Sequence, residues 1–244
     1  NEYYFRGGHR LWHAPEDRER TYVSDDDPIS IKLIDDGIQA IQPVESPTGI
    51  QKRIDVTLLA EEPFVRVIHR LTNRGARPVE LAPWAITQLR PGGFAILPQP
   101  AQDTGLLPNR RLALWPYTDL NSSHIKWGNR YVTIQATMRS GKLKIGWANP
   151  AGWLAYCIDG ILFVKYVDYQ PQSEYFDFGS SSECYCDPHF LELETLGPAA
   201  FLEPGQSVSH EERWFLTPYQ KVEPEELSVF ALGSFIEERI DAYF

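Results

Sequence analysis

One segment near the start of the chain gathers side chains that could bind a small polar molecule and exchange protons with it. Two glycines, which permit a tight turn or a close approach to a ligand, are followed at once by imidazole, guanidinium, indole and carboxylate groups. Imidazole titrates near neutral pH, guanidinium offers a planar fork of donors to hydroxyls or carboxylates, and an indole face suits the C–H face of a sugar ring. These side chains are His9, Arg10, Trp12, His13 and Glu16. A turn with a buried indole and solvated His9 and Arg10 would explain the same residues without any activity.

A pair of glutamates late in the chain could supply acid–base chemistry. Glu192 and Glu194 alternate with leucines, so in a strand both carboxylates project from one face. Two carboxylates buried together repel each other, which raises the pKa of one and suits a general base or acid. We therefore take both as candidate catalytic residues, with His189 close to the same surface. The alternative is a solvent-facing strand with ordinary glutamates.

Further candidates lie inside apolar stretches. Trp84 and Arg90 stand in a run with Gln88 that could line the mouth of a pocket, although Trp84 in a core and an exposed Arg90 would fit equally. Lys144 and Lys165 each interrupt an apolar strand pattern, and a lysine there needs a partner or a path to water. Glu183 or Glu192 would serve as that partner. His69, on the apolar face of its strand, is expected to be a hydrogen-bonded core histidine.

These side chains must be positioned by β-structure, because almost the whole chain reads as strands. Alternation predicts a hairpin of 29–34 and 38–44 around Asp35-Asp36-Gly37, and another of 153–158 and 161–167 around Asp159-Gly160. The Pro/Gly-rich stretch Gly92–Arg110 reads as a long loop. We predict a single domain over residues 1–244, an all-β, large antiparallel β-sandwich.

Only the tail of the chain has helical spacing. From Pro224, apolar residues recur at three- and four-residue intervals, with glutamates in the first turn, where a helix dipole favours negative charge. The spacing predicts a C-terminal helix that packs on a sheet edge.

Composition excludes several classes of protein. The chain has 244 residues, with 23 basic and 33 acidic side chains and a formal net charge of −10. This balance argues against nucleic acid or an anionic membrane as a partner, since both require positive charge. No apolar run reaches the roughly 20 residues that span a bilayer. Three cysteines without a Cys-x-x-Cys pair, and the lack of any phosphate-loop or dinucleotide motif, predict no metal and no cofactor. The chain opens without Met or a signal peptide, so the compartment stays open.

Three segments together resemble the galactose mutarotase-like superfamily, which includes aldose 1-epimerases and glucose-6-phosphate 1-epimerases. The block Gly7–Glu16 is similar to the Gly-Gly/Arg segment near the sugar cleft, and closest to that of an uncharacterised bacterial family. The run from Leu71 through Leu89 resembles the strand–turn–strand that delivers a catalytic histidine. The run from Glu192 to Leu216 resembles the end of the fold, where a catalytic glutamate precedes a Pro-Gly turn.

The resemblance implies a supersandwich with a sugar cleft on one concave face. These enzymes usually have more chain before the equivalent of Gly7, so one or two N-terminal strands are expected to be absent here. Their reaction needs no metal or redox cofactor: a carboxylate removes the proton of the anomeric hydroxyl while an acid, usually histidine, protonates the ring oxygen. The sequence departs from the pattern where it has Trp84 at the expected histidine position. The acid would then have to come from His9, His13 or His69.

The sequence therefore predicts a carbohydrate-active protein whose partner is a small sugar or oligosaccharide. The expected base is Glu192 or Glu194 and the expected acid His9 or His13. Side chains expected to bind the substrate are Arg10, Trp12, Glu16, Trp84, Arg90 and Lys165. Two alternatives stay open, a non-catalytic sugar-binding module and a lyase that acts on acidic sugars.

Overall fold

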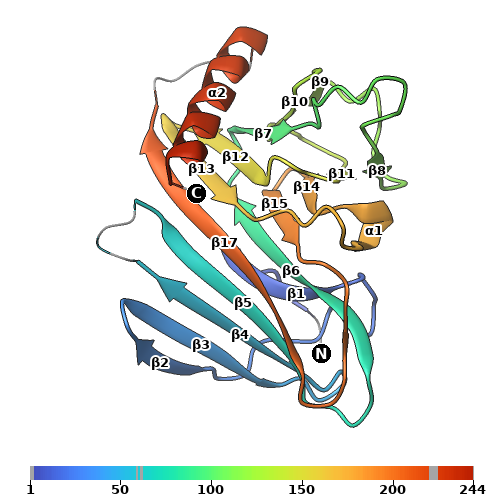
Figure 1. The fold of residues 1–244 in the computed structure, drawn as a ribbon, viewed down its shortest axis with the longest axis vertical. Coiled ribbons are helices and arrows are strands. Elements are labelled where there is room, and N and C mark those ends of the chain that lie inside the picture. Colours follow the sequence, from blue (N-terminus) through green and yellow to red (C-terminus); the bar gives the residue numbers. More distant parts are fainter. Residues whose placement is uncertain (1–2, 59, 61–62, 220–224, 244) are drawn as a thin grey trace.

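Two antiparallel β-sheets face each other in the computed structural model, which describes residues 3–58, 60, 63–219 and 225–243 (Figure 1). The seven-stranded sheet has the order β1 (His9–Ala14), β6 (Val79–Leu89), β15 (Leu191–Leu196), β14 (Ser182–Cys186), β11 (Leu143–Trp147) and β8 (Leu112–Leu114), with β16 (Ala200–Leu202) also paired to β6. The predicted all-β sandwich is confirmed.

The ten-stranded sheet is longer and carries the other half of the core. Its order is β2 (Ser30–Ile34), β3 (Gly37–Val44), β4 (Ile50–Thr57), β5 (Val65–Asn73), β17 (Ser207–Pro218), β13 (Ile161–Tyr166), β12 (Trp153–Ile158), β7 (Phe94–Pro98), β10 (Tyr131–Gln135) and β9 (Ile125–Trp127). Side chains from both sheets interdigitate, among them Leu97, Ile134, Ile145, Trp147 and Leu193, each at most 1% exposed. Burial of this apolar surface holds the sheets together.

The two hairpins expected from turn chemistry are present. Asp36 adopts φ +57° in the turn between β2 and β3, and Asp159 adopts φ +49° between β12 and β13. Aspartate tolerates this left-handed region better than most residues, which explains why the sequence marks both turns.

The expected long loop at 92–110 is wrong in its first part. Residues 94–98 form β7, a fully buried strand between β10 and β12. Its sequence Phe-Ala-Ile-Leu-Pro is short and bounded by glycines and prolines, so the turn signals around it hide a central strand.

The C-terminal helix α2 (Glu226–Tyr243) is confirmed, although its predicted start at Pro224 lies outside the described residues. It covers a face of the ten-stranded sheet, where Val229, Ile236 and Ile240 pack against Phe94 and Trp153 (Figure 1). The expectation that it caps a sheet edge is therefore wrong. Within the described part of the chain, no helix is long and apolar enough to cross a membrane.

The side chains of β1 alternate between the two faces of the seven-stranded sheet. Leu11 packs with Leu71 and Leu81 between the sheets, whereas Trp12 packs with Ala82 and Trp84 on the opposite side. We call the side toward the ten-stranded sheet the inner face and the opposite side the outer face of the seven-stranded sheet. Because neighbours in a strand point to opposite faces, consecutive residues of β1 enter different environments.

Candidate functional site on the outer face

Arg10 and Glu192 meet on the outer face although 182 positions separate them in the chain. Arg10 Nη2 donates to Glu192 Oε1 at 2.7 Å, and Gln88 Nε2 donates to the same oxygen at 3.0 Å. Strand β6 lies between β1 and β15, which puts the three side chains in adjacent rows. Burial and the negative charge of Glu194 raise the pKa of Glu192, while Arg10 opposes that shift.

Glu194 lies beside the two indoles that the sequence singles out. Trp84 Nε1 donates to Glu194 Oε2 at 2.7 Å, and Lys144 Nζ lies 2.9 Å from the same oxygen. The rings of Trp12 and Trp84 pack edge to face with centroids 5.4 Å apart, and the guanidinium carbon of Arg10 lies 4.4 Å from the centroid of Trp12. Cation–π contacts of this kind are strengthened where water is excluded.

Aromatic side chains lie over this site. The rings of Tyr3, Phe5 and Tyr22 all contact Trp12, and Trp12 Nε1 donates to the Tyr3 hydroxyl at 3.2 Å. Trp84 is only 2% exposed. A ligand that stacks on these indoles must therefore displace part of the N-terminal aromatic layer.

Two of the predicted acids point away from the glutamates. His9 and His13 share the inner face of β1, where His9 contacts His69 and His13 Nε2 lies 3.5 Å from Glu45. Burial lowers the pKa of both imidazoles, so both are neutral near pH 7. An acid–base pair of either histidine with Glu192 or Glu194 does not fit this geometry, because the sheet itself separates them.

The remaining predicted residues are dispersed. Lys165 lies on the inner side of the ten-stranded sheet, fully buried, and Arg90 lies beyond the end of β6 in an exposed ion pair with Asp159. Glu16 is exposed and accepts a hydrogen bond from Tyr22, at the rim of the outer face. The structure thus gathers Arg10, Trp12, Trp84, Glu192 and Glu194, and leaves Lys165 and Arg90 elsewhere.

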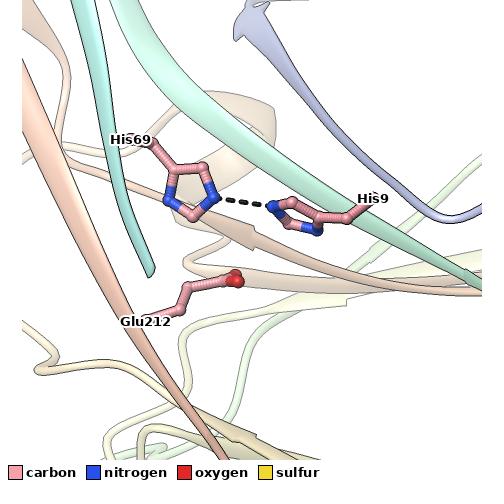
Figure 2. A group of neighbouring side chains, drawn as sticks. All are labelled: His9, His69 and Glu212. Atoms are coloured by element: carbon pink, nitrogen blue, oxygen red, sulfur yellow. Dashed lines mark hydrogen bonds between the residues drawn. The ribbon is translucent and has the colours of Figure 1, made fainter. Parts of the chain in front are cut away.

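The inner histidines belong to a buried polar network between the sheets. His9, His69 and Glu212 offer ligand atoms that all lie within 4.8 Å of one another, from three different strands, as Figure 2 shows. Such a group could hold a metal ion. His9 Nε2 and His69 Nε2 are 2.7 Å apart, however, and the dashed line in Figure 2 marks this hydrogen bond.

The donors and acceptors of this network satisfy one another. His69 Nδ1 donates to the His210 carbonyl at 3.0 Å, so its Nε2 accepts from His9. His9 Nδ1 in turn accepts from the Thr87 hydroxyl at 3.0 Å. The lone pair of His69 that a metal would need is therefore in use.

Glu212 is likewise fully engaged. Its Oε1 lies 2.7 Å from Lys165 Nζ and accepts from Thr195, and its Oε2 accepts from Trp214 at 2.7 Å. The Lys165 ammonium lowers the pKa of Glu212, which stays ionised. A buried cation thus already neutralises the only carboxylate of the group, and in this form the network is structural.

Sequence reasoning found some partners and missed others. The sequence predicts Glu183 or Glu192 as the partner of Lys144, and the Lys144 ammonium lies 2.7 Å from Glu183 Oε2. The sequence does not reveal Glu212 as the partner of Lys165. Asp177, whose carboxyl interacts with that of Glu183 on the outer face, was also missed. Neither residue carries a motif; only the pairing of the strands and one irregular turn bring them into place.

Comparison with solved structures identifies the fold. A candidate aldose 1-epimerase from Escherichia coli K12 superposes with a TM-score of 0.54 over 89% of this chain and 79% of that one, at 14% identity. A galactose mutarotase-like protein from Lactobacillus casei matches with a TM-score of 0.50 over 78% and 73% of the two chains, at 13% identity. A TPR-domain-containing protein from Parabacteroides distasonis matches with a TM-score of 0.55, but the alignment covers 88% of this chain and 40% of that one, at 13% identity.

The protein is thus a large antiparallel β-sandwich of the supersandwich class. Its fold is that of the galactose mutarotase-like superfamily. No protein-family model matches the chain, and no curated protein is significantly similar to it in sequence.

Proposed function

We propose that the outer face of the seven-stranded sheet binds a sugar and interconverts its anomers, with Glu194 as the base. The observation that carries this proposal is the meeting of Arg10, Glu192 and Glu194 with two indoles on one face of a mutarotase-like fold. Charged donors and acceptors recognise hydroxyls, and indole faces stack on sugar rings. A fold alone hosts many activities, so the site must carry the argument.

Glu194 suits the base better than Glu192 does. The Lys144 ammonium and the Trp84 N–H both contact Oε2, and these two contacts fix the orientation of the carboxyl group. Oε1 of Glu194 is buried and has no hydrogen-bond partner among the described residues. Glu192 is instead held by Arg10 and Gln88, and with them would bind ring hydroxyls.

Exchange between α- and β-anomers tests this proposal directly. Magnetisation-transfer NMR on a panel of aldoses and sugar phosphates should show exchange faster than in buffer. Glu194→Gln should lower the rate by about 10²–10⁴-fold, the usual contribution of a positioned acid or base. Glu211→Gln is the matched control, because Glu211 pairs with Arg66 on the other sheet and should leave the rate unchanged. A wild-type rate equal to that of buffer on every sugar would rule out the epimerase.

A non-catalytic sugar-binding module is the second candidate. It is favoured by Trp84, which stands where the epimerases have a histidine and cannot protonate a ring oxygen. Isothermal titration calorimetry distinguishes the binding module from the epimerase. A binding module should largely keep its affinity for a sugar in Glu194→Gln, and neither the wild type nor this variant should show anomer exchange. The lyase alternative is not supported, since Lys165 and Arg90 lie away from the outer face and Lys144 is engaged by two carboxylates.

A further inference from the structure

An exposed aromatic ring stands beside the indoles of the outer face. The short element α1 (Phe176–Gly179) contacts β8 and β11, and its residue Phe178 is 80% exposed (Figure 1). Phe178 adopts φ +58° and Asp177 adopts φ +50°, in the left-handed region that is unfavourable for residues with a side chain. Burial of the Phe178 ring does not compensate this strain, and strained residues of this kind cluster at sites that bind ligands.

Two hollows meet at the Phe178 ring. One, of about 190 Å³, is lined by Trp115, Asp177 and Phe178 among others. The other, of about 420 Å³, is lined by Arg111, Tyr175 and Phe178 among others. Because Phe178 lines both, its ring lies at their common border. We call the two hollows together the α1 groove.

The α1 groove adjoins the proposed sugar site on two sides. Tyr175, from the wall of the larger hollow, packs against the cluster that contains Trp12 and Trp84. In the smaller hollow, the centroid of the Trp115 ring lies 4.6 Å from Lys144 Nζ, and the same ammonium contacts the proposed base at 2.9 Å. A ligand bound at the indoles can therefore continue into the groove.

The lining of the α1 groove combines fixed aromatic rings with charged groups. The ring of Tyr169 stacks on that of Tyr175, with centroids 5.6 Å apart and an interplanar angle of 17°, and the Tyr175 hydroxyl accepts from the backbone N–H of Gln170 at 3.0 Å. Rings held in place before binding reduce the entropy that a ligand must overcome. Arg111 and Asp177 add a donor and an acceptor for hydroxyl groups.

The charge of the lining and its continuity with the indoles indicate the occupant. Arg111 lines the groove together with two acidic residues, Asp177 and Glu174, so neither sign of charge dominates. This balance favours a neutral ligand with many hydroxyls over a strongly charged one. A linear oligosaccharide repeats a ring with apolar faces and polar edges, which matches successive aromatic rings with polar groups beside them.

We propose that the α1 groove is a second sugar subsite and that the outer face binds a neutral oligosaccharide. This inference rests on the proposed function, which places one sugar unit at Trp12 and Trp84. The neighbouring unit of the same chain lies in the groove, with one apolar face on the Phe178 ring and its hydroxyls toward Asp177 and Arg111. The exposure of Phe178 and the left-handed backbone that presents its ring both follow from this role.

The dependence of affinity on chain length tests the subsite. Isothermal titration calorimetry compares glucose and galactose with their neutral di- and trisaccharides, among them maltose, cellobiose and lactose. At least one longer sugar should bind the wild type about two- to tenfold more tightly than its monosaccharide, the range typical of one aromatic contact. Phe178→Ala should remove this advantage and leave the affinity for the monosaccharide unchanged.

Phe178→Tyr is the matched control, because it keeps a flat ring at the same position and should keep the advantage of the longer sugar. Since Phe178 is exposed, both variants should unfold at the same urea concentration as the wild type. Equal affinity for short and long sugars in the wild type would overturn the subsite. An advantage that survives in Phe178→Ala would also overturn it.

Anomer exchange distinguishes failure of the subsite from failure of the proposed function. Exchange of monosaccharides without any dependence of affinity on chain length would remove the subsite and keep the epimerase. Binding that depends on chain length and on Phe178, without exchange, would support the subsite and remove the epimerase. A protein that binds no sugar of any length and shows no exchange would overturn both.

Discussion

The two faces of the seven-stranded sheet use similar polar side chains in different ways. On the inner face, His9 and His69 join a network in which every donor has an acceptor and Lys165 neutralises Glu212. On the outer face, Lys144 lies among more carboxyls than it can neutralise, and Glu194 Oε1 is unpaired in the described residues.

This difference distinguishes buried polar groups that stabilise the fold from buried polar groups that could act on a ligand. A buried polar network is stabilising only when it is fully satisfied, and the network around His9, His69 and Glu212 meets that condition. A buried site with an unused acceptor and an excess of like charge lowers the stability of the fold. Proteins retain such a costly arrangement where it takes part in binding or catalysis. Residue type alone would have suggested the opposite assignment, since imidazoles are the more usual acid–base groups.

Removing the inner cation should give the largest effect on stability. In Lys165→Met, Glu212 keeps its charge in a position with 0% exposure and loses its ion pair. Breaking one partner of a buried pair typically costs about 3–5 kcal/mol of unfolding free energy. Urea denaturation followed by tryptophan fluorescence should show that loss. The double variant Lys165→Met with Glu212→Gln should recover part of it, because the uncompensated charge is gone.

A small loss in Lys165→Met would contradict the comparison. It would mean that the inner network is not a satisfied unit and that Glu212 has access to water or to another cation. Zinc added to the same variant gives an independent reading, since a metal that restores stability would show that the site needs only a cation.

Lowering the pH should decrease the contribution of the inner face to the unfolding free energy and increase that of the outer face. Burial lowers the pKa of His210 to about 3, against about 6.5 in the unfolded chain. Between these values the unfolded state binds more protons, so the unfolding free energy falls as pH decreases, by at most about 1.4 kcal/mol per pH unit for one histidine. Glu183 has a raised pKa, so the folded state binds the extra proton and its contribution to stability rises as pH decreases.

Thermal denaturation between pH 7 and pH 4 measures both contributions. His210→Gln should flatten the loss of stability on acidification. Glu183→Gln should change the unfolding free energy more favourably at pH 7 than at pH 5, relative to the wild type. The reason is that the substitution removes a buried group that is costly to ionise. Equal pH dependence in wild type and both variants would show that neither face titrates as the structure implies.

Much of the fold could be predicted because its signals are local. Asp35-Asp36-Gly37 and Asp159-Gly160 mark tight turns, and the alternation beside them marks the strands. Strand β7 could not be recognised in this way, since its five buried residues lack alternation and lie within a stretch rich in glycine and proline. The prediction of the architecture rests on many such local signals, so one missed strand did not change it.

The site was predicted only in part, for physical reasons. Arg10 and Glu192 could be proposed as neighbours because both occupy strands of one expected cleft. The side on which His9 lies depends on which face of β1 meets the second sheet, and period-two alternation places His9 opposite Arg10 once that face is known. Asp177 reaches Glu183 through a left-handed turn, and backbone strain of that kind leaves no pattern in the residues around it.

The smallest expected effect concerns that turn, and it distinguishes strain at the site from strain elsewhere. Gly179 has φ +83° and Gly205 has φ +86°, so an alanine at either position should cost about 1 kcal/mol of unfolding free energy for its left-handed backbone. A Cβ at Gly205 meets nothing within 4 Å, whereas one at Gly179 would meet the Arg111 guanidinium, a flexible group that can move aside. Gly179→Ala should therefore lose slightly more unfolding free energy than Gly205→Ala, because the Arg111 guanidinium must move. Urea denaturation of both variants measures this difference, and a smaller loss in Gly179→Ala than in Gly205→Ala would show that Arg111 does not restrict the turn.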